Sequence, residues 1–344
     1  MDRKKIFNPQ GIDSLDQRKI IGGDTTNIFN LNNVKYQWAN NLYRTMMGNF
    51  WIPEKTDLTQ DKNDYVSLVD EEKDAYDGIL SFLVFLDSIQ TNNVPNISNY
   101  ITAPEVNLIL AIQTYQEAIH SQSYQYIIES ILPKEKRNLI YDKWRDDEVL
   151  FERNQYIAKI YQDFIDTPSN KNFSKVLIAN FLLESLYFYN GFNFFYLLAS
   201  RNKMMGTSDI IKLINRDELS HVVLFQNMIN EIKQENADYF SEKEIYEMFE
   251  VAVNQEIKWS KHIIGKKILG VTEKTIEDYT KWLANERLRS LGLNKLYEGY
   301  DKNPYKHLEK LADTEGEGNV KANFFEGNVT SYNMSSSIDG WDEL

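Results

Sequence analysis

The fold of this chain is decided by the stretch Gln116-Glu117-Ala118-Ile119-His120-Ser121-Gln122-Ser123-Tyr124, inside an apolar segment at about residues 105–132 that predicts a helix. Residues three and four apart share one face of a helix. Glu117, His120 and Tyr124 therefore line one stripe: a carboxylate, an imidazole and a phenol. Residues 215–221, Asn-Arg-Asp-Glu-Leu-Ser-His, again place a glutamate and a histidine three apart.

The two Glu-x-x-His pairs predict a metal site. One such pair is usually a surface accident, but two of the four histidines in this chain occur in the pattern. When two helices of a bundle each supply Glu-x-x-His, two others are expected to supply one inward carboxylate each. Asp87 is the only charge in residues 79–89, and Glu184 is the only charge between Lys175 and Arg201. Such a set suits two ions such as iron or manganese, whose charge would balance the buried acids. The predicted ligands are Asp87, Glu117, His120, Glu184, Glu218 and His221.

The hydrophobic pattern predicts an all-α fold. Apolar residues recur at helical spacing, and no useful stretch alternates as a β-strand does. We expect an N-terminal arm at residues 1–33, a helical domain at residues 34–311 and a disordered tail at residues 312–344, which are rich in Gly, Ser, Asn and acids. Within the domain we expect a loop at residues 92–96 and one amphipathic helix over about residues 133–166.

The composition excludes several classes of protein. The 344 residues include no cysteine, which excludes disulfides, cysteine-ligated metal centres and a thiol nucleophile. The formal net charge of -13 argues against a nucleic-acid partner. The polar sequence after Met1 shows no export signal, so we expect a cytoplasmic protein. The apolar run between Lys175 and Arg201 is long enough to span a membrane, but its asparagines and tyrosines favour a buried helix and no membrane partner.

Together these motifs resemble those of the small, radical-generating subunit of aerobic class I ribonucleotide reductases, a ferritin-like di-metal carboxylate family. The resemblance covers about residues 30–300 and the tail. It rests on four motifs in order: Leu86-Asp87-Ser88-Ile89-Gln90, Glu117 to Tyr124, Leu183-Glu184-Ser185 and Arg216 to His221. It implies a ferritin-like bundle that forms a homodimer and serves the reduction of ribonucleotides to deoxyribonucleotides.

The resemblance also implies how the ligands divide between the ions. One ion would be held by Asp87, Glu117 and His120. The other would be held by Glu184, Glu218 and His221. Glu117 and Glu218, the glutamates of the two Glu-x-x-His pairs, would bridge the ions. Two iron ions are expected; two manganese ions, or one of each, are alternatives because ligand type does not separate these metals.

A radical and its transfer are implied as well. Tyr124 matches the tyrosine that the metal site oxidises with O2 to a neutral radical. Asp217 matches the acid that orients His120, and Trp51 matches the tryptophan that begins an electron-transfer route to the surface. Tyr332 is the candidate relay tyrosine in the tail. The apolar pocket around the radical matches Phe188, Phe192 and Ile214.

The missing cysteines imply a partner, because ribose reduction in this family takes thiols. We expect a large catalytic (alpha) subunit that the acidic tail docks, and a flavodoxin-like or ferredoxin-like protein is a candidate reductant.

Two alternative functions remain. A di-metal oxidase or oxygenase acting on a small ligand would need neither Trp51 nor an aromatic tail, and a non-catalytic iron-binding bundle would not need Tyr124.

Overall fold

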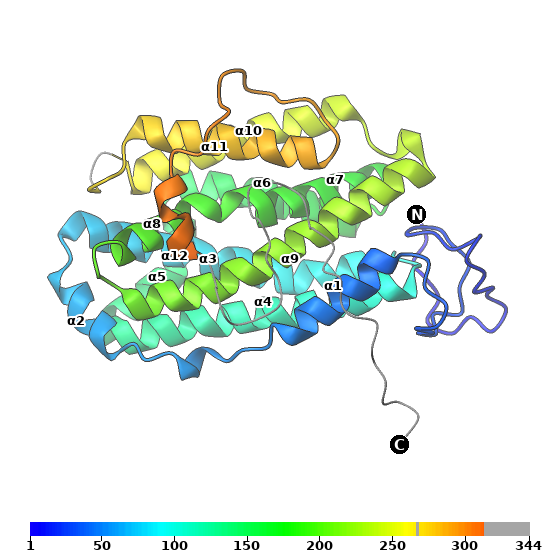
Figure 1. The fold of residues 1–344 in the computed structure, drawn as a ribbon, viewed down its shortest axis with the longest axis horizontal. Coiled ribbons are helices and arrows are strands. Elements are labelled where there is room, and N and C mark those ends of the chain that lie inside the picture. The colour runs from blue at the N-terminus through cyan, green and yellow to red at the C-terminus, as the bar shows by residue number, and fades with distance from the viewer. Residues whose placement is uncertain (266–267, 313–344) are drawn as a thin grey trace.

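The computed structural model describes residues 1–265 and 268–312, and over these ranges the regular structure is helical, without a β-strand. The expected all-α class is therefore confirmed. The long helices lie side by side in a bundle (Figure 1). The inner ones are α3 (Asp70–Ser98), α4 (Pro104–Ile131), α7 (Asn170–Leu182), α8 (Tyr189–Ala199) and α9 (Met205–Glu235). A π-helical segment, Leu183–Tyr187, joins α7 to α8.

The remaining helices surround this group. In Figure 1, α1 runs beside α4 and α9, and α10 and α11 lie along the opposite side of the bundle. Their bounds are α1 (Gln37–Gly48), α2 (Thr59–Ser67), α5 (Lys134–Asp146), α6 (Glu148–Asp166), α10 (Glu242–Ile263), α11 (Glu273–Ser290) and α12 (Glu309–Ala312). Short 3-10 turns occupy Pro53–Lys55, Ala237–Tyr239 and Lys306–Leu308.

Two local expectations were wrong. Residues 92–96 continue α3, because Pro95 lies in the last turns of the helix and its exposed ring removes only one backbone hydrogen bond. The expected helix over 133–166 is two helices. Asp147 interrupts it in an extended conformation and caps α6, where its Oδ1 accepts the N–H groups of Val149 (3.0 Å) and Leu150 (3.1 Å).

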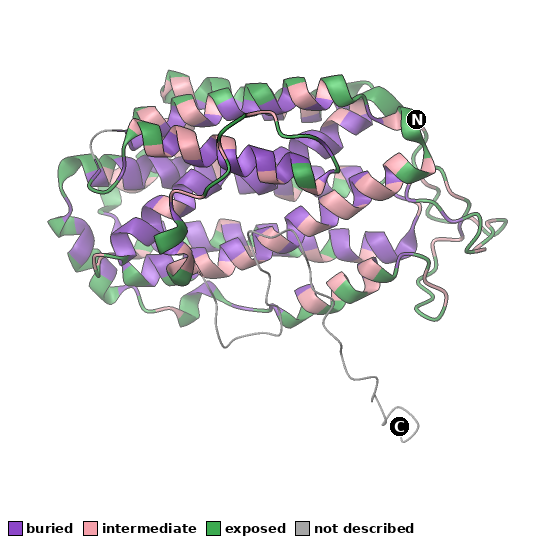
Figure 2. Ribbon diagram, turned by 45° about the horizontal axis from the view of Figure 1, so that its top comes forward, coloured by how far each residue is buried: buried purple, intermediate pink, exposed green. Residues whose placement is uncertain are grey.

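Burial follows the bundle interior. Buried residues line the inward faces of the long helices, and exposed ones face outward (Figure 2). Residues 1–33 form no helix, yet Ile20 is fully buried and Arg18 pairs with Glu105 at 3.4 Å. Among the described residues no helix is both long enough and apolar enough to cross a membrane.

Candidate metal centre

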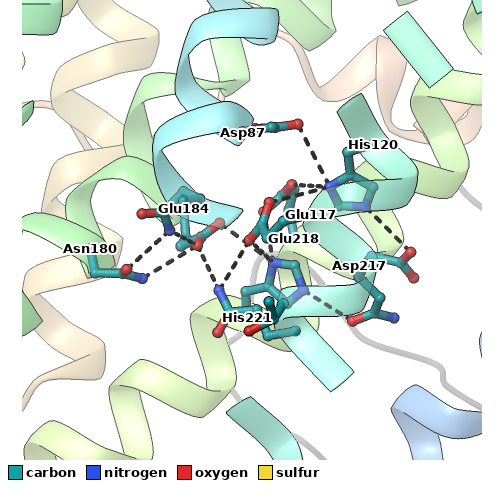
Figure 3. Close-up of polar contacts among 12 residues, drawn as sticks. Asp87, Glu117, His120, Asn180, Glu184, Asp217, Glu218 and His221 are labelled. Carbon is teal, nitrogen blue, oxygen red and sulfur yellow. Dashed lines mark hydrogen bonds and ion pairs between the residues drawn. The ribbon is translucent and has the colours of Figure 1, made fainter. Parts of the chain in front are cut away.

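The structure brings the six predicted ligands together inside the bundle (Figure 3). Four elements supply them. Asp87 comes from α3, Glu117 and His120 from α4, Glu184 from the π-helical segment, and Glu218 and His221 from α9. All six side chains are 0 % exposed, so any cation here would be bound away from solvent.

The six residues form two overlapping groups. Asp87 and His120 belong to one group, Glu184 and His221 to the other, and two glutamates, Glu117 and Glu218, belong to both. Within each group, one ligand atom per residue lies within 4.8 Å of the others. Two shared carboxylates between two clusters are the arrangement expected of bridging ligands.

Both histidines face the shared carboxylates. His120 Nδ1 lies 3.0 Å from Glu218 Oε1 and 3.6 Å from Glu117 Oε2. His221 Nδ1 lies 3.0 Å from Glu218 Oε2 and 3.3 Å from Glu117 Oε1. Each shared glutamate thus presents one oxygen to each histidine.

Unpaired polar atoms test whether these residues fit a pair of metal ions. Buried polar atoms are normally hydrogen-bonded, because leaving one unpaired costs roughly 1–3 kcal/mol. Here several ligand atoms make no hydrogen bond of normal geometry to the part of the chain that the structure describes: both carboxylate oxygens of Asp87, Glu117 Oε2, His120 Nδ1, Glu184 Oε2 and Glu218 Oε1. These converging oxygens and nitrogens suit two divalent cations, so the residues fit a di-metal centre.

The pKa shifts reflect crowding of buried charge. Burial, together with the negative charges of Glu117 and Glu218, raises the pKa values of Asp87 and Glu184 well above the usual range. Burial also raises the pKa of Glu218, but its contact with Glu184 and the charge of His221 outweigh burial and hold that pKa low. A bound cation must therefore displace protons from this site.

The outer ring nitrogens of the two histidines have different partners. His120 Nε2 lies 3.4 Å from Asp217 Oδ2, and Trp51 Nε1 donates a hydrogen bond to the same oxygen at 2.8 Å. His221 Nε2 lies 3.0 Å from Gln116 Oε1. Gln116 and Trp51 both line a surface pocket of about 270 Å³ between α1 and α4. The predicted grouping of Trp51, Asp217 and His120 is thus present in the structure.

Tyr124 is fully buried on α4, one turn beyond His120. Its hydroxyl makes no hydrogen bond of normal geometry to any described residue. Burial, and then the negative charge of Asp87, raise the pKa of Tyr124 well above its usual value, so the neutral phenol is favoured. Phe188, Phe192 and Ile214 are all buried, and the ring centroids of the two phenylalanines lie 5.6 Å apart in a stacked arrangement. The contact of these three residues with Tyr124 stays a prediction. Tyr332 lies outside the described residues.

Sequence reasoning gave no role to the amides that surround Glu184. Its Oε1 accepts N–H groups from Gln113 (2.8 Å), Asn180 (3.3 Å) and Gln90. Gln113 precedes Glu117 by four residues and Asn180 precedes Glu184 by four, so each shares a helix face with a ligand. That spacing is the only signal in the sequence, and buried amides are too common for it to indicate a site.

The π-helical segment that carries Glu184 is held by two arginines. Arg153 Nη2 donates to the carbonyl oxygen of Tyr187 at 2.7 Å, and Arg287 Nε donates to that of Ser185 at 3.1 Å. A π-helical turn within an α-helix is rare and often lies at a functional site. No periodicity in the sequence predicts this segment.

Comparisons with known proteins agree with this geometry. The family model described as "Ribonucleotide reductase, small chain" matches residues 28–304. The beta subunit of ribonucleoside-diphosphate reductase from Treponema pallidum is 44% identical over 98% of this chain and 97% of its own length. Its counterpart from Halalkalibacterium halodurans is 34% identical over 100% of this chain and 99% of its own length. The ribonucleotide reductase R2 subunit from Clostridium botulinum superimposes with a TM-score of 0.88 at 46% identity, covering 91% of this chain and 99% of that one.

Proposed function

We infer, because this chain belongs to the ribonucleotide reductase small-chain family, that it generates the radical with which a ribonucleoside-diphosphate reductase makes deoxyribonucleotides. The expected ferritin-like bundle is confirmed by its structural likeness to an R2 subunit. Membership also implies a large-subunit partner and a homodimer. The oxidase and the iron-binding bundle are not favoured by these relatives.

The observation that carries the proposal is the buried cluster of two ligand groups sharing Glu117 and Glu218, one helical turn from Tyr124. Asp87 and His120 would complete one ion's ligands, and Glu184 and His221 the other's. When bound, the two ions would supply O2-dependent oxidising power, and Tyr124 would give up one electron together with its phenol proton. Two iron ions are proposed, with manganese in one or both positions as the alternative.

The surrounding residues have separate proposed tasks. Full burial keeps Tyr124 from external reductants, and Phe188, Phe192 and Ile214 are proposed to exclude water from it. Asp217 accepts from the Trp51 indole while it lies beside the His120 imidazole, so the three form a continuous polar path toward the surface. We propose that this path carries the electron.

The tail is proposed to connect the two subunits. Residues 312–344 would dock the large subunit, and Tyr332 would relay the radical to it; Tyr332 and all of this tail after Ala312 lie outside the described residues. A flavodoxin-like or ferredoxin-like protein is proposed as the reductant. The arm at residues 1–33 and the helical domain at residues 34–311 complete the proposed division of the chain.

Electron paramagnetic resonance on the full chain tests the proposal, after ferrous iron and O2 are added and, in parallel, manganese. We expect a tyrosyl signal that is absent from Tyr124→Phe. Tyr126→Phe is the matched control, because Tyr126 lies two residues away on α4 and donates to the carbonyl of Thr56, away from the cluster. Tyr124→Phe should keep its metals and lose all nucleotide reduction with the large subunit. Bound metal without a radical under any loading, or full activity of Tyr124→Phe, would contradict the tyrosyl mechanism.

A further inference from the structure

One oxygen of Glu184 is occupied by amide groups. Gln113 Nε2 donates to Glu184 Oε1 at 2.8 Å and Asn180 Nδ2 donates to it at 3.3 Å; Gln90 Nε2 is the third donor. All three amide side chains are fully buried; Gln113 comes from α4, Asn180 from α7 and Gln90 from α3. Figure 3 shows Asn180 beside Glu184 on the side away from Asp87. We call these three residues the amide clamp.

The clamp is itself fixed by further hydrogen bonds. Gln90 Nε2 also donates to Asn180 Oδ1 at 3.0 Å, and Tyr161 donates its hydroxyl to Gln90 Oε1 at 2.7 Å. Gln113 Nε2 also donates to Glu117 Oε1 at 3.2 Å. Metal binding ionises Glu184, and an ionised carboxylate only accepts hydrogen bonds, so each amide must then keep its nitrogen toward Glu184. The network therefore allows the amides one orientation.

The other oxygen of Glu184 is left for a cation. Glu184 Oε2 makes no hydrogen bond of normal geometry within the described chain and lies 3.5 Å from His221 Nδ1. The corresponding residue of the other ligand group differs, because Asp87 lies beside the hydroxyl of Tyr124 and makes no hydrogen bond of normal geometry to any described residue. The two terminal carboxylates are thus constrained unequally.

We propose that the amide clamp is a set of positioning residues that restricts Glu184 to binding its ion through Oε2 alone, while Asp87 remains free to bind through one or both oxygens. Turning Glu184 so that both oxygens reach the ion would break up to three charge-assisted hydrogen bonds in a buried site, where each such bond is stronger than in water. The inference rests on the di-metal part of the proposed function and not on the radical.

The test is a crystal structure of the full chain loaded with Mn2+, which needs neither O2 nor turnover. In the wild type we expect only Oε2 of Glu184 within bonding distance of the ion beside His221. The double variant Gln90→Met/Gln113→Met removes two donors at similar volume, and both oxygens of Glu184 should then bind. Gln122→Met/Gln125→Met is the matched control, because these glutamines lie on the exposed face of α4.

Each outcome decides a different point. Two-oxygen binding of Glu184 in the wild type would overturn the proposal, even if the clamp variant does not fold. One-oxygen binding in both the wild type and the clamp variant would overturn it too, because the amides would then not be the cause. A protein that takes up no Mn2+ would instead contradict the proposed di-metal function.

Discussion

At the residue scale, the two histidines differ in the group that holds each outer nitrogen. His120 lies beside the carboxylate of Asp217, whereas His221 lies beside the neutral amide of Gln116. A carboxylate partner makes a metal-bound imidazole more basic than an amide does, and it fixes the tautomer. The two ions would therefore be held by unequal ligands even though the shared glutamates are arranged symmetrically.

Asp217→Asn tests this difference. The replacement keeps the shape of the side chain and one oxygen that can accept from Trp51, but it removes the negative charge that faces His120. Metal affinity at the position of His120 should fall about 10–100-fold, with less effect at the position of His221. Calorimetric titration with Mn2+ measures both steps. Asp209→Asn, at an exposed site on α9, is the control, and equal affinity in wild type and Asp217→Asn would disprove the role.

The raised pKa values of Asp87 and Glu184 predict how metal binding depends on pH. Because both pKa values lie well above the usual range, these acids hold protons at pH values where ordinary carboxyls are ionised. Binding must release those protons, so affinity should rise as pH rises and weaken as pH falls. Titrations in buffers of different ionisation enthalpy count the protons. We expect Asp87→Asn to release fewer protons than the wild type when the metal binds. A metal affinity that does not change with pH, without proton release, would be inconsistent with the raised pKa values of Asp87 and Glu184.

At the scale of elements, the π-helical segment depends on a buried ion pair. Arg153 donates to Glu256 at 2.7 Å and 3.0 Å, stacks on the ring of Phe82 and also holds the carbonyl of Tyr187. Burial raises the pKa of Glu256, and the charge of Arg153 opposes that effect. The same guanidinium thus joins α6 and α10 to the segment that carries Glu184.

Arg153→Met should lower the free energy of unfolding by about 3–5 kcal/mol, because it leaves the buried carboxylate of Glu256 without its cation. Adding Glu256→Met should recover most of that loss, since the pair is then replaced by apolar side chains. Denaturant unfolding of the metal-free protein measures both. Arg145→Met, which breaks an exposed pair with Asp142, should cost under about 0.5 kcal/mol. A loss no greater for Arg153→Met than for this control would show that the pair is not structural.

The same scale shows what the sequence could and could not predict. Helical period was enough for the all-α class, and Glu-x-x-His on two helices together with the lone acids of two apolar segments was enough for six side chains that the structure brings together. Pro95 was misread because a proline near a helix end costs little when its ring faces solvent. The amide clamp and the arginines were not predictable, because buried amides and arginines are common and their spacing does not single out the oxygen that each one contacts. Their chemistry depends on which neutral side chains happen to face Glu184.

At the scale of the whole molecule, membership of the small-chain family implies a large-subunit partner. The candidate oxidant is generated at fully buried residues, and the chain has no thiol to reduce a ribose. Trp51, 9 % exposed at the surface pocket, is the residue of the proposed path nearest to solvent. Activity must therefore depend on how the large subunit is held near this protein. We propose that the tail holds it there.

Deleting the residues after Asn323 tests that assignment. Because the metal ligands and Tyr124 all lie before residue 222, the truncated protein should bind metal and form the radical as the full chain does. It should lose affinity for the large subunit, because Phe324, Phe325 and Trp341 are removed with the acidic terminus and aromatic side chains are frequent anchors of binding segments. Sedimentation of the two subunits together measures the affinity, and paramagnetic resonance measures the radical. A synthetic peptide of residues 324–344 should compete with the full chain for the large subunit, whereas a scrambled peptide should not. Unchanged affinity after truncation would place the docking surface on the helical domain instead.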